Sequence, residues 1–332
     1  MTKQTLKVDS DHAQLRLDVF LTKNLTDIPS RTFIKRLIDD GQVSVNEKIV
    51  KAHYKVSVED QVVIHLPDQE APIEHIAPEN IPLNIFYQDE VLLVINKPAG
   101  MLVHPVPGCS SGTLVNALLH YCQSETNAVG AAKKKMETAE PVRSLSDVNS
   151  SFRPGIVHRL DRETSGLILI AKDNRTHVQL AKAFEHHRVK KQYVALVQGK
   201  IEFDQGVIDA RLGRHPTHWD KKAVALDEED GREARTFYQV RQRFEKKATL
   251  VALFPESGRT HQLRVHMAHL GHPVLGDDKY GMRNSFPRLA LHAQGIGFVH
   301  PQTKQFVEFF CPCPPEFLKG VMQSVLPEAF AG

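Results

Sequence analysis

The sequence predicts an α+β protein that consists of a small amino-terminal domain and one large domain. Consecutive pairs of short strands favour a mixed, mostly antiparallel central sheet with flanking helices over a regular strand–helix repeat. Residues 67–82 contain four prolines and four acidic residues but no lysine or arginine, which is typical of an extended linker. A chain of 332 residues is long enough for two domains. We therefore expect domains at 1–66 and 83–325, joined by a linker at 67–82.

The small domain is expected to combine two helices with a small sheet. The expected elements are helices at 15–23 and 30–41 and strands at 43–45, 49–50 and 56–64. Ser30 is a good N-cap for the second helix. Arg31 and Lys35 lie one helical turn apart and share a face of that helix. Such a face is either a solvated surface or a site for phosphate groups.

Polar turns and N-caps define the expected elements of the large domain. Residues 88–90 separate two apolar strands, and Thr113 and Asp173 are N-caps of helices. The expected helices lie at 113–121, 173–184 and 260–271, and the expected strands at 85–87, 91–95, 156–158, 167–171, 193–197, 237–240, 249–254, 289–292 and 306–310. Residues 123–154 are rich in small and polar side chains without sustained periodicity, so we expect a flexible surface insertion there.

Composition points to an ordinary globular protein. Hydrophobic residues make up 41% and charged residues 24% of the chain. Aliphatic runs such as Val91–Ile95 are far shorter than the roughly 18 residues of a membrane-spanning helix. The amino terminus is polar, and the four cysteines are too scattered for a disulfide framework. We therefore expect a protein of the cytoplasm that does not contact a membrane.

A polar loop at 158–166 lies between two predicted strands, a position in which catalytic groups are commonly held. Within it, Asp161 has Arg159 and Arg162 as cationic neighbours, which would keep its carboxylate ionised and available as a nucleophile or a base. The alternative is that Asp161 only closes a turn or pairs with an arginine.

A second dense stretch of polar residues spans 257–266. His261 and Arg264 are three residues apart, so we expect them on one face of the predicted helix. An arginine in this position could hold a buried carboxylate or clamp a phosphate in a bidentate manner, or it could form a surface ion pair.

Known cofactor motifs are missing from the sequence. His266, His269 and His272 are evenly spaced, but Gly271 breaks the helix and no further ligand lies at metal-binding spacing. A P-loop, a GxGxxG motif and a GxSxG elbow are also absent. We therefore expect neither a metal nor a nucleotide cofactor.

The net charge of +3 is too small to indicate a partner, but the charge is unevenly distributed. Residues 153–191 carry nine basic and four acidic side chains, a net charge of +5, together with four histidines. A nucleic-acid binder is recognised by such local charge rather than by the total. This basic zone surrounds Asp161.

Several blocks of the sequence are similar to one enzyme family. The segment GIVHRLDRETSGLILIAK at 155–172 resembles the catalytic-aspartate motif of the RluA-type pseudouridine synthases. Further blocks follow the order of that family: INKPAGMLVHP at 95–105, KQYVALVQG at 191–199, GRTHQLRVHMAHLGHPVLGDDKYG at 258–281 and RLALHA at 288–293. Residues 1–66 are similar to an S4 RNA-binding domain. GTLVNALLHY at 112–121 and RHPTHWDKKAV at 214–224 resemble most the RluD branch, which modifies 23S rRNA of the large ribosomal subunit.

The resemblance implies a pseudouridine synthase fold and an isomerase that acts on a flipped-out uridine. It implies that Asp161 is the catalytic aspartate and that Arg264 is the basic residue paired with it. It also implies that Tyr193 packs in the site and takes part in proton transfer at the base. Arg159 would occupy the gap left by the extracted nucleotide.

The resemblance also implies how RNA is held. It implies that His158 contributes to RNA binding in the large domain, and Arg31 and Lys35 in the S4-like domain. The implied partner is 23S rRNA, and we expect the enzyme to act as a monomer without a cofactor.

Two other classes of protein would use some of the same residues. An N-glycosylase acting on RNA or nucleosides would also use a lone aspartate but would release free uracil. A non-catalytic factor in ribosome assembly would use the basic surfaces and would not need Asp161.

Overall fold

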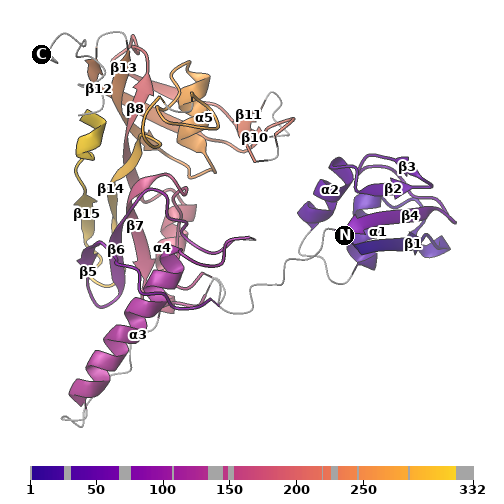
Figure 1. Ribbon diagram of the computed structural model, residues 1–332, viewed down its shortest axis with the longest axis horizontal. Helices are drawn as coiled ribbons and strands as arrows, with labels where there is room; N and C mark the ends of the chain where they lie inside the picture. Colours follow the sequence, from indigo (N-terminus) through magenta and orange to yellow (C-terminus); the bar gives the residue numbers. More distant parts are fainter. Residues whose placement is uncertain are drawn as a thin grey trace, which may run out of the picture. The chain divides into compact units, whose positions relative to one another are not determined.

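The computed structural model describes residues 2–25, 31–66, 76–106, 108–133, 145–148, 153–218, 220–225, 231–244, 247–282 and 285–318. The chain divides into two compact units, Met1–Glu74 and His75–Gly332, which are drawn from indigo to yellow in Figure 1. Among the described residues, no helix is long and apolar enough to cross a membrane.

Two helices pack on a four-stranded sheet in the first unit. The helices are α1 (Leu17–Asn24) and α2 (Arg31–Asp39), and the sheet has the order β1-β4-β2-β3. Its strands are β1 (Thr2–Lys7), β2 (Val43–Val45), β3 (Lys48–Ile49) and β4 (Gln61–Leu66). A short 3-10 helix, η1, spans Ser10–His12. The two predicted helices and the hairpin at 43–50 are confirmed. Strand β1 was not predicted, because its sequence is polar, and it extends the sheet along the edge of β4.

Within the described residues of the second unit, nine strands form one large sheet and two form a separate hairpin. The large sheet has the order β5-β6-β7-β14-β8-β13-β12-β9, and β15 pairs with β14 beside this path. Strands β7 and β14 run parallel, whereas the other pairs are antiparallel, so the predicted mixed, mostly antiparallel sheet is confirmed. The strands of the large sheet are β5 (Ile85–Gln88), β6 (Leu92–Lys97), β7 (Ser165–Ala171), β8 (Lys190–Gln198), β9 (Gln205–Asp209), β12 (Arg235–Phe244), β13 (Ala248–Pro255), β14 (Leu291–Val299) and β15 (Phe306–Phe310). The hairpin consists of β10 (Leu212–Arg214) and β11 (Lys222–Val224).

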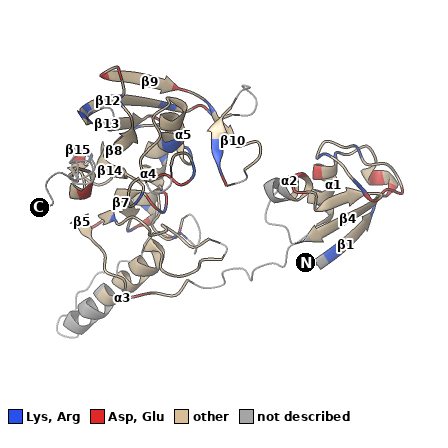
Figure 2. Ribbon diagram, turned by 45° about the horizontal axis from the view of Figure 1, so that its top comes forward, with Lys and Arg blue, Asp and Glu red and all other residues tan. Residues whose placement is uncertain are grey.

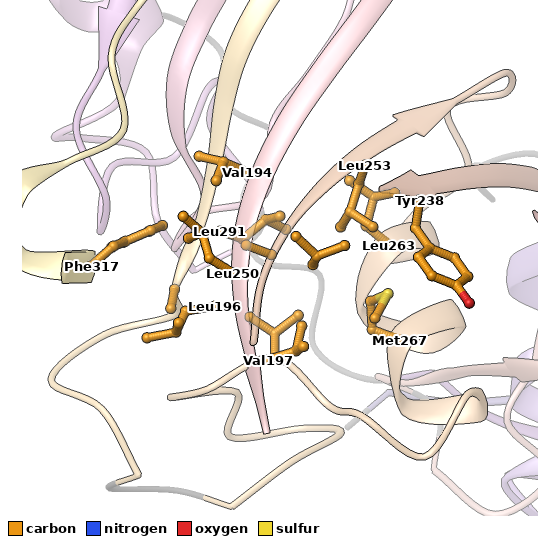
Figure 3. Close-up of a cluster of buried hydrophobic side chains, with 14 of the residues drawn as sticks. Val194, Leu196, Val197, Tyr238, Leu250, Leu253, Leu263, Met267, Leu291 and Phe317 are labelled. Atoms are coloured by element: carbon orange, nitrogen blue, oxygen red, sulfur yellow. The ribbon is translucent and has the colours of Figure 1, made fainter. Parts of the chain in front are cut away.

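In the described part of the second unit, the helices α3 (Leu114–Lys133), α4 (Asn174–Glu185) and α5 (Gln262–His269) accompany the large sheet. Asp173 caps α4 as predicted, because its carboxylate accepts a hydrogen bond from the Thr176 amide at 2.8 Å. Leu263 and Met267 of α5 pack into the largest hydrophobic cluster of this unit together with side chains of β8, β12 and β13 (Figure 3). This packing fixes the position of α5 and therefore of Arg264, which α5 carries.

Two predictions for the large domain are wrong. The helix expected at 113–121 is longer, because α3 continues to Lys133 through a segment that contains three alanines, the residue that favours helices most. Residues 123–133 of the predicted insertion are therefore helical, and its expected flexibility stays a prediction. Residues 134–144 and 149–152 lie outside the described residues, and Leu145 and Ser146 are buried. The strand expected at 156–158 is only an isolated bridge between Ile156 and Ile170, because a turn from Arg153 to Ile156 bends the chain there.

Part of the expected linker belongs to the second unit. Residues 67–75 lie outside the described residues. Ile76 is buried, the Glu79 amide donates a hydrogen bond to the Asn116 carbonyl at 3.0 Å, and the Glu79 carboxylate accepts one from the Gly112 amide at 3.1 Å. Residues 76–82 therefore pack against the beginning of α3. The predicted end of the large domain, at 325, also lies outside the described residues.

Candidate active site

A buried lysine, Lys97, forms hydrogen bonds that hold the loop that carries Asp161 in place. Lys97, at the end of β6, is fully buried and donates hydrogen bonds to the carbonyls of Pro98 at 2.8 Å, Met101 at 2.9 Å and Arg162 at 3.1 Å. Burial lowers the pKa of Lys97 to about 8, although the carboxylates of Glu163 and Asp161 oppose the shift. The single ammonium group thus joins the turn after β6 to the loop at 158–164.

An open pocket of about 480 Å³ lies above this loop. It brings together four of the residues that the sequence singled out: Asp161 and Arg159 from the loop, Tyr193 from β8, and Arg264 from α5. The remaining lining residues come from the same elements, from the end of β13, from the segment between β13 and α5, and from the start of β14: Leu160, Thr164, Lys191, Pro255, Ser257, Gly258, Arg259, His261, Gln262, Leu263 and Leu291.

Arg264 lies within ion-pair distance of three carboxylates, those of Asp277, Asp278 and Asp161. Its side chain is 5% exposed and forms a bidentate pair with Asp277, with Nε–Oδ2 at 2.7 Å and Nη2–Oδ1 at 2.6 Å. Its Nη1 lies 3.8 Å from Oδ2 of Asp161, which is 20% exposed. The expected pairing of Arg264 with the loop aspartate is therefore present, but the closer partner is Asp277, which sequence reasoning missed.

Tyr193 is held as a neutral phenol beside Asp161. Burial raises the pKa of Tyr193 well above its usual range, and the negative charge of Asp161 raises it further. At neutral pH this side chain, which lines the pocket, therefore keeps its proton.

Cations outnumber the acids that line the pocket. Lys191 donates hydrogen bonds to the carbonyls of Glu256 at 3.0 Å and Ser257 at 2.9 Å, and burial together with Arg259 lowers its pKa to about 8. Arg159 and Arg259 also line the pocket, whereas Asp161 is the one acid among its described lining residues. Figure 2 shows basic residues in α5, which carries Arg264, and in β10. This balance suits a polyanionic ligand.

His261 lies at the start of α5 in a different position from the predicted one. It is the N-cap residue, with a left-handed φ of 58°, so it does not share a helix face with Arg264. Its ring still lines the pocket, and its Nδ1 lies 2.8 Å from the Tyr280 hydroxyl. That hydroxyl also accepts a hydrogen bond from the Lys222 amide of β11 at 2.7 Å. Burial lowers the pKa of His261, with Asp161 opposing the shift.

His158 is not among the residues that line the pocket. Its Nε2 accepts a hydrogen bond from the Leu169 amide at 2.9 Å, and its ring stacks on Phe184 of α4 with centroids 4.5 Å apart. Burial, together with the positive charge of Lys191, lowers the pKa of His158 to about 3, so the ring is neutral and anchors the loop to β7 and α4. The predicted contribution of His158 to RNA binding stays a prediction.

Two of the three evenly spaced histidines, His266 and His272, make contacts within the fold. His266 is fully buried, with Nδ1 2.9 Å from the Thr236 hydroxyl and Nε2 3.1 Å from the Ala210 carbonyl, and His272 lies 2.8 Å from the Gln198 carbonyl. In the described part of the chain, no group of three or more His, Cys, Asp or Glu residues is arranged to hold a metal ion.

The two basic residues that the sequence singled out in the first unit, Arg31 and Lys35, belong to α2. The Arg31 backbone belongs to α2, but its side chain lies outside the described residues. Lys35 is exposed and lines a shallow groove. The other residues of this groove are Arg16, Ile38, Asp39, Ile49, Val50, Lys51, Ala52, His53 and Tyr54.

Comparisons with known proteins agree with this arrangement. Residues 91–269 match the family model described as RNA pseudouridylate synthase, and residues 15–62 match the S4 domain. The chain is 40% identical to the RNA pseudouridine synthase YlyB of Bacillus subtilis, over 95% of this chain and 96% of that protein. It is 37% identical to the ribosomal large subunit pseudouridine synthase D of Zymomonas mobilis, over 91% of each chain.

A solved structure shares the architecture of the second unit. Human RNA Pseudouridylate Synthase Domain Containing 4 is 25% identical, with a TM-score of 0.53 over 72% of this chain and 92% of that chain. The predicted fold and the predicted RNA-modifying isomerase are thereby confirmed. With its catalytic domain and its S4 domain both matched, the chain belongs to the family of RNA pseudouridine synthases.

Proposed function

We propose that this enzyme isomerises specific uridines of 23S rRNA and that Asp161 is its catalytic carboxylate. The observation that carries the proposal is the pocket in which Asp161 lies between Arg264 and Tyr193. Relatives named ribosomal large subunit pseudouridine synthase D support the substrate, because they are 37% and 36% identical over most of both chains.

The reaction needs groups of the kinds that this pocket supplies. The bond from N1 of uracil to the ribose C1′ breaks, the base turns, and a bond from C5 to C1′ forms while C5 loses a proton and N1 gains one. Atoms and electrons balance without an oxidant or a phosphate donor. A carboxylate serves this chemistry either as a nucleophile or as the group that stabilises and deprotonates the ribose. Asp161 is the acid among the described lining residues that can fill this role.

The neighbours of Asp161 have separate roles in the proposal. Tyr193 places a protonated phenol against the base, where it can exchange a proton with the uracil ring. Arg264 offsets the charge of Asp161 without closing on it, because its nearest nitrogen lies 3.8 Å away. Arg159 is exposed at the rim and is placed to enter the space that the extracted nucleotide leaves.

Binding must offset the cost of removing a uridine from its stack. Unstacking a nucleotide costs a few kcal/mol and is cheapest in loops and single-stranded segments. Arg159, Lys191 and Arg259 supply positive charge at the pocket, and Lys35 and Lys51 supply it on the S4 domain. We propose that Arg31 acts with Lys35, and that the enzyme works as a monomer in the cytoplasm.

The proposal is tested by mapping pseudouridine in rRNA from cells that lack the gene. Reverse transcription after chemical labelling should show that specific sites in 23S rRNA are lost in the deletion strain and restored by the wild-type gene. A matched gene that carries Asp161→Asn should restore none of them. If every 23S site remains in the deletion strain, the proposed substrate is wrong. If the Asn variant restores the sites, the proposed role of Asp161 is wrong.

A further inference from the structure

Asp277 forms hydrogen bonds with two of the three nitrogens of the Arg264 guanidinium. Its two oxygens accept hydrogen bonds from Nε at 2.7 Å and from Nη2 at 2.6 Å, and Nη2 also lies 3.4 Å from Asp278. Nη1 is the nitrogen left facing Asp161. A bidentate pair fixes the plane of the guanidinium as well as its position, because two parallel bonds must be kept at once.

Asp277 is itself held rigidly. Its side chain is fully buried, and Oδ1 accepts hydrogen bonds from the amides of Lys279 at 2.9 Å and Tyr280 at 3.0 Å. The Tyr280 ring lies against the guanidinium of Arg264, with its centroid 5.2 Å from Cζ. The turn at 277–280 therefore fixes the position of the Arg264 guanidinium independently of Asp161.

The distance between Arg264 and Asp161 is longer than that of a tight ion pair. A charge-assisted bond between an arginine nitrogen and a carboxylate is about 2.7–2.9 Å long. Arg264 Nη1 and Asp161 Oδ2 are 3.8 Å apart, and in the described part of the chain no hydrogen bond reaches the carboxylate oxygens of Asp161. Both oxygens are therefore left for the substrate, although a buried arginine lies beside them.

We propose that Asp277 is a positioning residue for the isomerisation: its bidentate grip holds Arg264 near Asp161 and prevents the two from closing into a tight ion pair. This inference rests on the proposed role of Asp161. Without the grip, the guanidinium would rotate toward the remaining carboxylate and occupy the oxygens that must meet the ribose. A displacement of about 1 Å at a reacting group can cost about a hundredfold in rate.

The test is the single-turnover rate of pseudouridine formation by the full-length protein. The substrate is total RNA from cells that lack the gene, because it contains whichever uridines the enzyme modifies. Asp277→Asn should lower the rate about a hundredfold and leave the dissociation constant for RNA within twofold of the wild type. Asp278→Asn is the matched control, because Asp278 also faces Nη2 but is 59% exposed. Its rate should stay within threefold. A loss of less than tenfold in Asp277→Asn overturns the inference.

A second comparison separates positioning from general support of the fold. In an Arg264→Gln background, adding Asp277→Asn should change the rate by less than threefold, because Asp277 no longer has a guanidinium to hold in position. The double variant should also melt no lower than Arg264→Gln, because that single variant leaves Asp277 buried without its partner. If Asp277→Asn lowers the rate by the same factor in the Arg264→Gln background as in the wild type, the inference is overturned.

If Asp277→Asn does not fold, Asp277→Glu takes its place. The longer side chain keeps the charge pair but shifts the guanidinium, so the rate should still fall at least tenfold. A wild-type rate in this variant overturns the inference. Asp161→Asn, measured on the same RNA, tests the proposed function separately. This variant should form no pseudouridine, whatever the rates of the Asp277 variants are.

Discussion

At the scale of single residues, the site depends on buried charges whose partners are distant in sequence. Lys97 joins its own turn to the carbonyl of Arg162, 65 residues later, and Arg264 is seated by Asp277, 13 residues later. Asp161 and Arg264 could be singled out from the sequence because each lies in a dense run of polar and cationic residues. Asp277 could not be singled out in this way, because its role depends on the contact that the turn at 277–280 makes with Arg264 of α5. Its signals in the sequence are the pair of adjacent acids after Gly276 and their place in the block at 258–281 that resembles the pseudouridine synthases.

His158 gives a prediction for the dependence of stability on pH. Its pKa falls from 6.5 in the unfolded chain to about 3 in the folded protein, so the unfolded state binds the proton first as the pH drops. The neutral ring therefore contributes stability above pH 6.5 that is lost as the pH falls toward 3. Between pH 6.5 and pH 4.5, the wild type should lose about 2 kcal/mol more unfolding free energy than His158→Gln.

Urea unfolding of both proteins at the two pH values measures this difference. The glutamine keeps a hydrogen-bond acceptor for the Leu169 amide but cannot bind a proton. Equal losses in the two proteins would show that His158 titrates normally and is not part of the packed interior.

At the scale of elements, the parallel pairing of β7 with β14 holds the Asp161 loop in place. Gly166 lies opposite Ala293, with a φ of 116°, and a Cβ added to it would lie 2.2 Å from the Ala293 carbonyl oxygen. No other residue type allows the two strands to approach so closely while β7 starts only four residues after Asp161.

Gly166→Ala should therefore lower the free energy of unfolding by at least about 3 kcal/mol, because both the φ angle and the contact with β14 become unfavourable. Chemical denaturation measures the loss. Gly258→Ala is the control, because an added Cβ there meets nothing within 4 Å, and it should cost less than about 1 kcal/mol. A wild-type stability for Gly166→Ala would mean that β7 and β14 are not packed as described.

The elements that could be predicted from the sequence are those with local signals. The hairpin β5–β6 has a polar turn between two apolar strands, and Asp173 caps α4. The strands β9, β10 and β11 were missed, because they are short, partly exposed and stabilised by contacts with distant residues. Tyr280 and Lys279 hold the segment around β11, through the Lys222 amide at 2.7 Å and the Asp220 carboxylate at 2.7 Å. No local pattern reveals such contacts.

At the scale of the whole molecule, we propose that RNA recognition is divided between two units with separate cores. The first unit has its own buried cluster, which includes Phe20, Ile34 and Ile64, and the second unit contains the candidate catalytic pocket. The charge of the whole chain, +3, conceals this division, because acidic residues near the domain boundary offset basic residues around Asp161.

The contribution of the S4 domain should appear in the salt dependence of RNA binding. Each phosphate contact with single-stranded RNA adds about 0.7 to the slope of log affinity against log salt concentration. Lys35→Ala should weaken RNA binding and reduce the slope by about that amount, because Lys35 is exposed in the basic groove. Deletion of residues 1–66 should reduce the slope further and leave the catalytic domain folded. Filter binding across a salt series measures both effects.

Lys7→Ala is the control for this series, because Lys7 lies outside the groove and pairs with Glu59 at 2.5 Å. It should leave the slope unchanged. If Lys35→Ala and the deletion also leave it unchanged, the S4 domain does not contact phosphates.

The most direct test of the account is the product formed by the purified enzyme from a 23S rRNA transcript labelled in uracil. The account predicts that the wild-type protein converts specific uridines to pseudouridine and releases no free uracil, and that Asp161→Asn binds the transcript with similar affinity but forms no pseudouridine. Release of free uracil by the wild type, or pseudouridine formation by Asp161→Asn, would contradict it.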